Sequence, residues 1–453
     1  MINIILYFFS ASAFLLFSTA AFISLKENEA FAVKRFSLLT IVSPLPFLSL
    51  ALFDFAFKNE ITIALFILIG GFVVVVLLPI GKNKNYRQTI PAQKQDERDI
   101  MFSRSELEPD SENFENYYSR NPDKKELDDN FRSQSGLLEP GTTQYNPFHF
   151  ASADASFETI EKLRDFVNGE KSKNKIPVDP EEISNYIKRW SKKLGAVDCG
   201  VTALKEYHLY SVGGRSERYG KKVVNNHKYA IAFTVEMAKE MVSSAPSGSM
   251  IMESGRQYLE SGKIALQVAK FIRNLGYEAR AHIDGNYEVI CPLVARDAGL
   301  GEIGRMGLLM TPKLGPRVRI SVVTTNLPLV TGKPLNDYSM IDFCAKCEKC
   351  AAACPGKAIP FGEMKETGGI KRWRINPEAC FTLWTSLGTD CGRCVSVCPY
   401  SHPDNILHNT VRLGIKNSSI FRALAVKLDD LFYGRKPRPA KLPDWLRIKI
   451  KNN

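Results

Sequence analysis

Three long apolar stretches restrict what the first eighty residues can fold into. Residues 2–25 and 61–80 contain no charged side chain, and residues 36–57 contain only Asp54. A helix of about 20 apolar residues spans the hydrocarbon core of a bilayer. A cleavable signal peptide is disfavoured because no basic N-terminal region is present and two more apolar stretches follow; a buried core helix is the other alternative. The sequence therefore predicts a three-helix transmembrane anchor over residues 1–80.

Basic residues next to these stretches predict the side of the membrane. One cluster follows the first stretch and another follows the third: Lys26, Lys34 and Arg35, then Lys82, Lys84 and Arg87. An odd number of spans separates each cluster from the N-terminus, so both lie on one side, and positively charged loops face the cytoplasm. We therefore expect a multi-pass protein of the inner (cytoplasmic) membrane, with the lipid bilayer as a partner and residues 81–453 in the cytoplasm.

The distribution of charge distinguishes between classes of partner. The net charge is +12, and most of the surplus lies in the basic stretches 82–94 and 435–451. A surplus beside apolar sequence favours a membrane surface, and no nucleic-acid partner is expected. Residues 81–144 are polar and show no sustained apolar period, which predicts a flexible linker. Residues 411–453 are interpreted as a basic C-terminal tail.

Eight of the ten cysteines lie between residues 344 and 398 and carry the strongest chemical signal. Residues 344–355 read Cys-x2-Cys-x2-Cys-x3-Cys-Pro, and residues 391–399 read Cys-x2-Cys-x3-Cys-Pro, with Cys380 upstream. This is the spacing of ferredoxins that carry two iron–sulfur clusters. Zinc is the alternative metal, but zinc sites have no use for the Cys-Pro ending. The two other cysteines, Cys199 and Cys291, are interpreted as buried packing residues.

The same spacing divides the ligands between two [4Fe–4S] clusters. Three cysteines spaced two apart bind one cluster, and the fourth, before proline, binds the other. The predicted sets are Cys344, Cys347, Cys350 and Cys398 for the first cluster, and Cys354, Cys380, Cys391 and Cys394 for the second. Residues 336–410 are therefore predicted to form a ferredoxin-like domain that conducts single electrons.

Residues 145–335 alternate between strand and helix patterns and predict an α/β or α+β domain. Residues 228–235 and 317–325 predict strands, and residues 256–275 predict an amphipathic helix that ends at Gly276. A Gly-x-Gly-x-x-Gly string begins at Gly299, but it lacks the preceding strand and the later acidic residue of a nicotinamide site. A glycine-rich turn that approaches some large cofactor is the preferred interpretation.

Several separated motifs resemble those of the corrinoid-dependent reductive dehalogenases. In the order of that family they are HKYAI at 227–231, AGLGEIGR at 298–305, GPRVR at 315–319, NLPL at 326–329 and the two cysteine motifs. The resemblance runs from about residue 157 to residue 402, more than half of the chain. Respiratory members of the family resemble exported proteins with a separate membrane anchor. This chain looks like the self-anchored transmembrane branch instead.

The resemblance implies a nitroreductase-like corrinoid-binding domain beside the ferredoxin-like domain. It also implies a base-off cobamide cofactor, and the absence of an Asp-x-His-x-x-Gly string fits a cobamide bound without a histidine ligand. The glycine-rich motif implies contacts to this cofactor from Gly299, Gly301, Gly304, Arg305 and Gly307.

Three catalytic residues are implied by the same resemblance. The proton-donating tyrosine of the family matches Tyr258, and its partner arginine matches Arg317. Asp284 matches a variable polar position of the family, where the related epoxyqueuosine reductases have a catalytic aspartate. A phenol keeps its proton at neutral pH, and a nearby guanidinium stabilises the phenolate that is left after donation.

The sequence thus predicts a reductive dehalogenase that acts on an organohalide and takes electrons from a ferredoxin, a flavodoxin or a membrane quinol. One alternative is an epoxyqueuosine reductase-like enzyme with the same cofactors. The membrane spans and the pairing of Tyr258 with Arg317 disfavour it. The other alternative is a non-catalytic, membrane-tethered electron-transfer protein or corrinoid carrier, which would need no proton donor.

Overall fold

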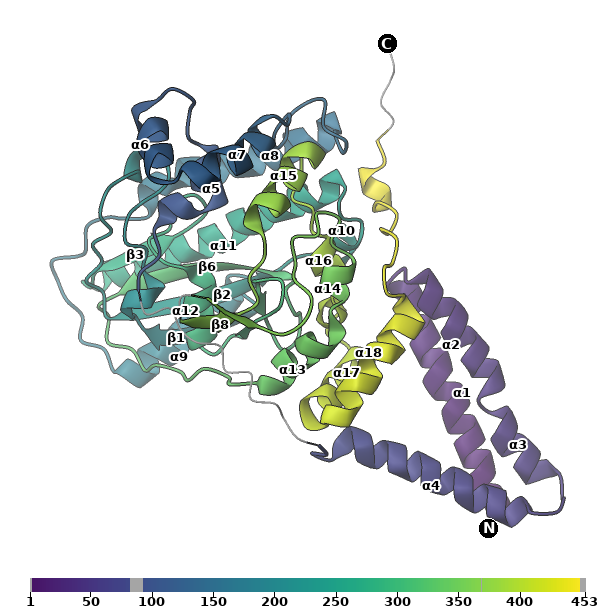
Figure 1. Ribbon diagram of the computed structural model, residues 1–453. Helices are drawn as coiled ribbons and strands as arrows, with labels where there is room; N and C mark the ends of the chain where they lie inside the picture. The colour runs from purple at the N-terminus through teal and green to yellow at the C-terminus, as the bar shows by residue number, and fades with distance from the viewer. Residues whose placement is uncertain (1, 82–92, 368, 449–453) are drawn as a thin grey trace. The chain divides into compact units, whose positions relative to one another are not determined.

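The computed structural model describes residues 2–81, 93–367 and 369–448, and the chain forms two compact units (Figure 1). The first unit comprises Met1–Asn85, Tyr338–Cys347 and Pro403–Arg438; the second comprises Tyr86–Asp337, Glu348–His402 and Pro439–Asn453. The predicted ferredoxin-like segment 336–410 is therefore divided between the units. The basic cluster Lys82, Lys84 and Arg87 lies outside the described residues.

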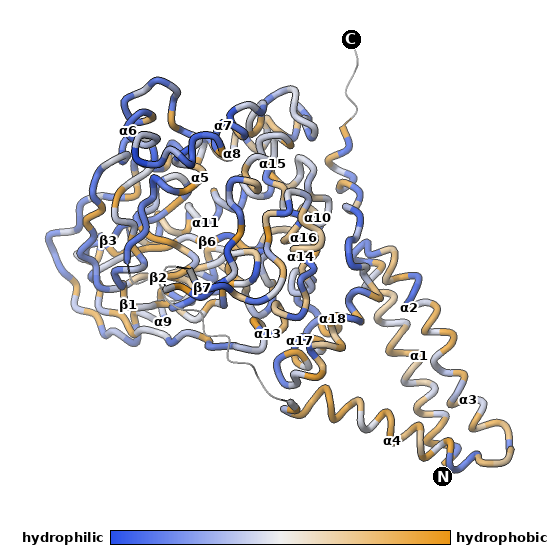
Figure 2. Tube along the Cα trace, in the orientation of Figure 1, coloured by the Kyte–Doolittle hydropathy of each residue, from blue (hydrophilic) through white to orange (hydrophobic). Residues whose placement is uncertain are grey.

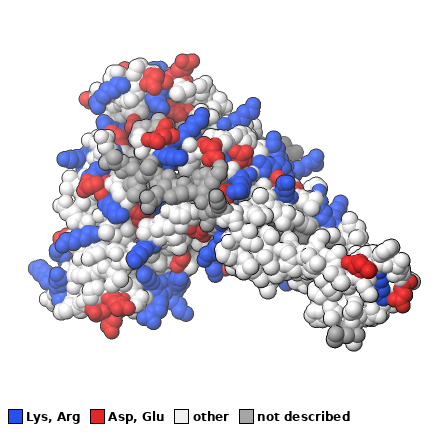
Figure 3. All heavy atoms as spheres, turned by 60° about the horizontal axis from the view of Figure 1, so that its bottom comes forward, with Lys and Arg blue, Asp and Glu red and all other residues white. Residues whose placement is uncertain are grey.

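Four apolar helices begin the first unit: α1 (Ile2–Lys26), α2 (Ala30–Val42), α3 (Leu45–Leu52) and α4 (Lys58–Leu77). Three segments are long and apolar enough to cross a membrane, namely Ile2–Lys26, Ala30–Leu52 and Lys58–Leu77. The second one is broken near Pro44, because proline has no N–H to continue the helical hydrogen bonds. Hydrophobic residues dominate these helices in Figure 2, and few charged side chains lie along them in Figure 3. Three candidate spans are thus confirmed.

The predicted C-terminal tail, 411–453, is wrong for much of its length. Its first part belongs to the helices α17 (Ile406–Asn417) and α18 (Ser419–Tyr433), which pack with α13 (Tyr338–Cys347) in the first unit. Arg422 is fully buried and its Nη1 donates to Asp342 Oδ2 at 3.0 Å. The basic composition of this segment misled the prediction, because Arg422 forms a buried ion pair with Asp342 instead of facing solvent.

The second unit is built on a four-stranded antiparallel sheet. Its order is β1-β2-β6-β3, from β1 (Asp198–Ala203), β2 (Tyr229–Glu236), β6 (Val318–Thr325) and β3 (Ala279–His282). Two of these strands confirm the predictions at 228–235 and 317–325. Ile231 and Phe233 lie on one face of β2, and Ala230 and Ala232 lie on the other, each in a buried core. Burial of both faces explains why the strand sequence is apolar throughout.

Helices cover both faces of this sheet. The core on one face includes residues of α8 (Pro147–Lys162), α9 (Pro180–Lys193) and α11 (Gly248–Asn274); α12 (Cys291–Asp297) contributes to the core on the other face. The predicted helix 256–275 is confirmed, but α11 begins earlier, at Gly248, and ends before Gly276, which has a φ of +84°. This architecture is α+β, and its antiparallel sheet excludes a parallel doubly wound fold.

Shorter elements complete the second unit. They are η2 (Leu163–Phe166), η3 (Glu206–His208), η4 (Ser216–Arg218), α10 (Lys239–Ser243), β4 (Glu302–Ile303), β5 (Leu309–Met310), α14 (Lys349–Ala352), β7 (Lys365–Thr367), β8 (Ile370–Arg372), α15 (Pro377–Leu387), α16 (Arg393–Ser396), η5 (Pro399–Ser401) and η6 (Asp444–Leu446).

The prediction of a flexible linker at 81–144 is wrong wherever the structure describes it. The segment forms η1 (Glu97–Asp99), α5 (Met101–Ser105), α6 (Glu112–Arg120) and α7 (Pro122–Arg132). These helices bury the aromatic side chains Phe114, Tyr117, Tyr118 and Phe131. Each helix is so short that its few apolar residues give no period over a longer window, which is why the polar composition misled the prediction.

A buried ion cluster fixes this segment to α15. Arg104 and Asp128 are both buried, and Arg104 Nε donates to Asp128 Oδ2 at 2.8 Å. Arg104 Nη2 also donates to Glu378 Oε1 of α15 at 3.0 Å. Removing one partner of a buried ion pair leaves an uncompensated charge, which costs much more than an exposed pair contributes.

Asp128→Ala is therefore expected to lower the free energy of unfolding by about 3–5 kcal/mol. Asp129→Ala is the matched control, because the Asp129 side chain is 48% exposed and its ion pairs with the exposed Lys125 and the half-buried Arg132 are screened by solvent. Denaturant titration of the detergent-solubilised protein measures both variants. Equal, small losses in the two variants would show that the buried cluster does not hold this segment.

Candidate active site

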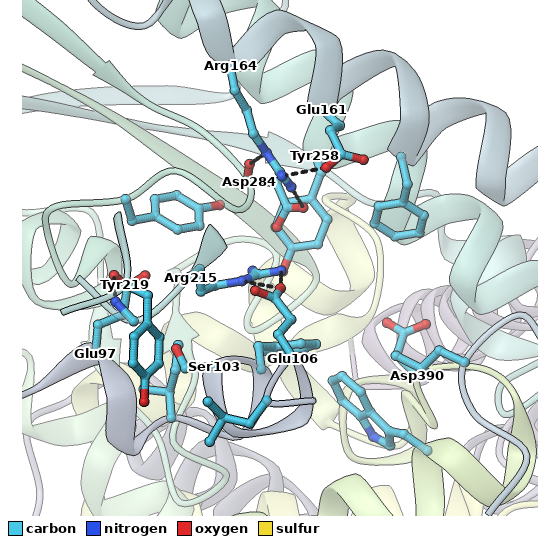
Figure 4. A pocket seen from close by; sticks show the side chains of 18 of the residues that line it. Glu97, Ser103, Glu106, Glu161, Arg164, Arg215, Tyr219, Tyr258, Asp284 and Asp390 are labelled. Atoms are coloured by element: carbon cyan, nitrogen blue, oxygen red, sulfur yellow. Dashed lines mark hydrogen bonds and ion pairs between the residues drawn. The ribbon is translucent and has the colours of Figure 1, made fainter. Parts of the chain in front are cut away.

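The second unit contains a cavity of about 800 Å³ (Figure 4). Several distant parts of the chain line it. Tyr258 and Arg319 come from α11 and β6, Glu106 comes from the segment that follows α5, and Trp384 and Asp390 come from the stretch between two cysteines. The cavity thus joins the sheet domain to the cysteine-rich segment.

A smaller cavity of about 210 Å³ shares four lining residues with the first. They are Tyr210, Tyr258, Tyr287 and Arg319. The walls of the smaller cavity also include apolar side chains, such as Leu309 and Val318. Aromatic and aliphatic walls with a few polar groups are typical of pockets that hold large cofactors.

Tyr258 lines both cavities. It is half-buried, and in the described part of the chain its hydroxyl makes no hydrogen bond, so the O–H is available to a ligand in the cavity. Burial raises the pKa of Tyr258, while the charge of Arg319 lowers it. The phenol therefore holds its proton at neutral pH.

Arg319, rather than the predicted Arg317, is the partner of Tyr258. Its guanidinium carbon lies 5.0 Å from the centroid of the Tyr258 ring. Its Nη2 donates to Ser254 Oγ at 2.6 Å and to Asp390 Oδ2 at 3.2 Å. The buried Nε of Arg319 has no hydrogen-bond partner within the described residues, so one donor remains for a ligand or a phenolate.

Arg317 is occupied elsewhere. Its side chain is fully buried, and it donates to Ser401 O at 2.9 Å and to Glu236 Oε1 at 2.6 Å. It lines neither of the two cavities that Tyr258 borders. The two arginines are two residues apart, and strand periodicity gives both the same face, so spacing alone could not distinguish them.

Asp284 lies in the same cavity as Tyr258, on the turn after β3. Arg164 Nε donates to its backbone carbonyl at 3.0 Å, and Arg164 Nη2 is 4.0 Å from its Oδ2 (Figure 4). Burial raises the pKa of Asp284, and the charges of Arg215, Arg164 and Arg319 oppose this shift. The predicted residues Tyr258 and Asp284 are thus brought together, and Arg317 is not.

The glycine-rich motif lines neither Tyr258 cavity, in contrast to what the resemblance implied. A Cβ at Gly301 would lie 2.2 Å from the carbonyl oxygen of Met310, so this glycine permits packing against β5. The backbone N–H of Gly307 donates to Gly304 O at 3.0 Å, which closes a turn. Gly299 has a φ of +84°, and Arg305 donates to the carbonyls of Pro360 and Gly362. These residues shape the backbone.

A third cavity, of about 990 Å³, is lined by Gly307 together with Arg372 and Trp373. Gly307 is therefore the one member of the predicted glycine set that borders this space. A contact of Gly307 with the cofactor stays a prediction.

The eight clustered cysteines are buried or half-buried. Cys344 and Cys347 lie on α13 of the first unit, and the other six lie in the second unit. Within the second unit, five of these thiols are close enough to interact electrostatically. Burial is the main cause that raises the pKa of Cys394 well above its usual value. The nearby thiols, Cys350, Cys380, Cys391 and Cys354, raise this pKa further. Thiols in such surroundings ionise when a metal binds them. The assignment of each cysteine to a cluster stays a prediction.

Several residues of the cavity were not predicted from the sequence. Arg215 pairs with Glu106, which belongs to the segment predicted as a linker, and Arg164 pairs with Glu161, three residues earlier in the chain. No motif marks these residues, because they meet only in the folded chain. Arg319 did have a signal, since it belongs to the same GPRVR motif as Arg317.

Comparisons with known proteins agree with this architecture. Residues 343–402 match the model of a 4Fe-4S dicluster domain. The tetrachloroethene reductive dehalogenase of Sulfurospirillum multivorans is 30% identical over 294 residues, which are 57% of this chain and 58% of that protein. The enzyme of the same name from Desulfitobacterium hafniense is 30% identical over 300 residues, which are 56% of this chain and 54% of that protein. The chain therefore spans little more than half the length of these relatives.

Solved structures show the same fold. The catabolic reductive dehalogenase NpRdhA, in complex with 3-bromo-4-hydroxybenzoic acid, matches with a TM-score of 0.62 and 24% identity over 80% of this chain and 50% of that one. The epoxyqueuosine reductase of Leadbetterella byssophila is 24% identical over 247 residues, 49% of this chain and 80% of that protein. The chain is thus a homologue of the reductive dehalogenases, and the epoxyqueuosine reductases are its more distant relatives.

Proposed function

We propose that this protein is a membrane-anchored reductive dehalogenase, which replaces a halogen of an organohalide by hydrogen and uses a base-off cobamide and two [4Fe–4S] clusters. One observation carries the proposal. Tyr258, with Arg319 over its ring, lines a large cavity whose lining also includes Trp384 and Asp390, and Asp390 is next to a predicted cluster ligand. The proton donor and the electron route thus reach the same space.

The residues of the two Tyr258 cavities fit a cobamide. Tyr210, Tyr287, Leu309 and Val318 would contact the broad apolar surface of a corrin, and the unpartnered Nε of Arg319 offers a buried donor. The bound cobamide would supply the reducing metal centre for cleavage of the carbon–halogen bond. A lower ligand from histidine is not expected, because the chain has no Asp-x-His-x-x-Gly string.

Side chains of the protein supply the proton that the reaction consumes. Reduction of a carbon–halogen bond consumes two electrons and one proton and yields a carbon–hydrogen bond and a halide ion. Tyr258 donates the proton from its hydroxyl, and Arg319 stabilises the phenolate until the proton is replaced. Asp390 and Ser254 hold Arg319 in position through the two hydrogen bonds described above.

The electrons enter through the cysteine-rich segment. The proposed second cluster, on Cys354, Cys380, Cys391 and Cys394, is the one next to the cavity, because Asp390 immediately precedes Cys391. The first cluster, on Cys344, Cys347, Cys350 and Cys398, would accept electrons from the external donor. This donor is a ferredoxin, a flavodoxin or a membrane quinol in the proposal.

Reconstitution tests the proposed function. We expect the purified protein, supplied with iron, sulfide and a cobamide, to bind about eight irons per chain and to release halide from an organohalide when reduced. The protein without cobamide is the control and should release none. Full cofactor loading without halide release from a broad panel of organohalides would contradict the proposal.

The orientation of the membrane anchor is a separate proposal. We place the catalytic unit in the cytoplasm, because Lys26 ends the first span and Lys34 and Arg35 lie near the start of the second, so all three flank the same loop. Reporter fusions at Gly81 and at the C-terminus should be active only with a reporter that works in the cytoplasm. Activity of a periplasmic reporter at either position would reverse the orientation.

One observation favours a second candidate, an epoxyqueuosine reductase-like activity. Asp284 shares the cavity with Tyr258, and burial raises the pKa of its carboxyl group, as a carboxylic proton donor requires. The candidate predicts that Asp284→Asn is more damaging than Tyr258→Phe. A larger loss of activity in Tyr258→Phe than in Asp284→Asn would contradict this second candidate.

A further inference from the structure

The charges that line the 800 Å³ cavity are unevenly distributed. The lining carboxylates outnumber the guanidinium groups by six to three. The carboxylates are Glu97, Glu106, Glu108, Glu161, Asp284 and Asp390, and the guanidinium groups are Arg164, Arg215 and Arg319. Glu97 is neutralised by Arg218 at 3.0 Å, outside the lining. Even with Asp284 protonated, negative charge remains in excess.

Each of the three guanidinium groups is already paired with a carboxylate of the chain, and Figure 4 shows the pairs of Arg164 and Arg215. Arg215 Nε and Nη2 donate to Glu106 Oε1 at 2.8 and 2.6 Å. Arg164 Nη1 donates to Glu161 Oε1 at 2.9 Å, and Arg319 Nη2 is 3.2 Å from Asp390 Oδ2. An anionic ligand would therefore meet guanidinium groups whose charge is already balanced by a carboxylate of the chain.

Of the three pairs, we expect that of Arg215 and Glu106 to affect the binding of an anionic substrate most. Arg215 is 16% exposed and Glu106 is 37% exposed, so the acid lies towards solvent and the base lies deeper. Charge interactions are screened less in a partly buried cavity than on the surface. Arg215 would therefore attract a substrate anion if Glu106 did not neutralise it.

We propose that this cavity selects electrically neutral organohalides over halogenated carboxylates and phenolates, and that Glu106 enforces the selection by neutralising Arg215. The inference rests on the proposed function, because it names the substrate class of the same site. An anion loses its hydration on entry and meets an excess of negative charge. A neutral organohalide loses little hydration free energy and gains apolar contacts. The segment that carries Glu106 thus contributes to specificity.

A matched pair of ligands tests the selection. 3-Bromobenzamide and 3-bromobenzoate have nearly the same shape, but only the second is an anion at neutral pH. Equilibrium binding of each to the full-length protein in detergent is measured by calorimetry, together with halide release. We expect the amide to bind at least about ten-fold more tightly, since that ratio corresponds to only about 1.4 kcal/mol. The preference should shrink as salt is added.

Two variants test the role of Glu106. Glu106→Gln keeps the shape of the side chain but leaves Arg215 with its charge, so it should reduce the preference for the amide about ten-fold. Glu108→Gln is the matched control. It removes one charge from the same cavity lining but not from a guanidinium pair, because no ion pair of Glu108 occurs in the part of the chain that the structure describes. It should therefore change the preference less than Glu106→Gln.

The outcomes separate the inference from the function on which it rests. Tighter binding of 3-bromobenzoate than of 3-bromobenzamide by the unchanged protein would overturn the selection. An unaltered preference in Glu106→Gln, or an equal change in Glu108→Gln, would overturn the role of Glu106. Preferential binding of the amide without halide release from any organohalide would support the charge selection and contradict the proposed dehalogenase.

Discussion

Tyr258→Phe is expected to remove most dehalogenation while the protein keeps its fold and its cofactors. The substitution deletes one hydroxyl, which makes no hydrogen bond to another described residue. The ring still packs near Phe157, at 6.3 Å between centroids, and beneath Arg319. A positioned proton donor is typically worth about 10²–10⁴-fold in rate, so halide release should fall by that factor. Steady-state assays of halide release by the cofactor-loaded protein measure this rate.

The two nearby arginines provide the control for this prediction. Arg319→Gln should also slow halide release, because the phenolate of Tyr258 loses its neighbouring positive charge. Arg317→Gln should mainly lower the melting temperature, because the buried Arg317 donates hydrogen bonds to backbone carbonyls and to Glu236. A mild Tyr258→Phe together with an inactive Asp284→Asn would show that Asp284 donates the proton instead.

The elements with strong local signals could be predicted from the sequence. The candidate membrane spans follow from uninterrupted apolar length, and β2 follows from a run of apolar residues that both faces of the sheet bury. The cysteine motifs predicted a dicluster domain, and the match at 343–402 confirms it. In each case the information lies within a short stretch of sequence.

The elements that depend on distant contacts could not be predicted in the same way. Residues 97–132 form short helices whose stability comes from pairs such as Arg104 with Glu378, which are 274 positions apart. Arg317 and Arg319 share one motif, and only the fold shows which of them reaches Tyr258. Gly299 and Gly307 have positive φ angles and Gly301 permits close packing against Met310, whereas the sequence spacing had suggested a cofactor loop.

The cavity shows how these two kinds of information combine. Sequence motifs supply Tyr258 and the cysteine neighbour Asp390, whereas the missed segment supplies Glu106 and part of the wall. Ser254 Oγ donates to Asp390 Oδ2 at 2.5 Å, and Arg319 contacts both residues. The residue that precedes a proposed cluster ligand is therefore hydrogen-bonded to the arginine that lies over the proposed proton donor.

Cys380→Ala is expected to remove one of the two proposed clusters and to abolish halide release. Cys380 is the least conventional of the proposed ligands, because it lies eleven residues before Cys391 instead of close to it. In the folded chain α15 carries Cys380 into electrostatic contact with Cys354 and Cys391, after burial the largest influences that raise its pKa to about 12. A thiol with a raised pKa stays protonated unless a metal ion stabilises the thiolate, and the thiolate is the form that binds iron.

The iron content decides this prediction. The reconstituted Cys380→Ala variant should hold about four irons per chain in place of about eight, because the first cluster keeps all of its ligands. Cys199→Ala is the control, since Cys199 lies buried in the sheet core, and it should keep the full iron content. Halide release should be lost with the second cluster, because that cluster adjoins the cavity through Cys391 and Asp390. A full iron content in Cys380→Ala would exclude Cys380 as a ligand and leave the fourth position of the second cluster to another group.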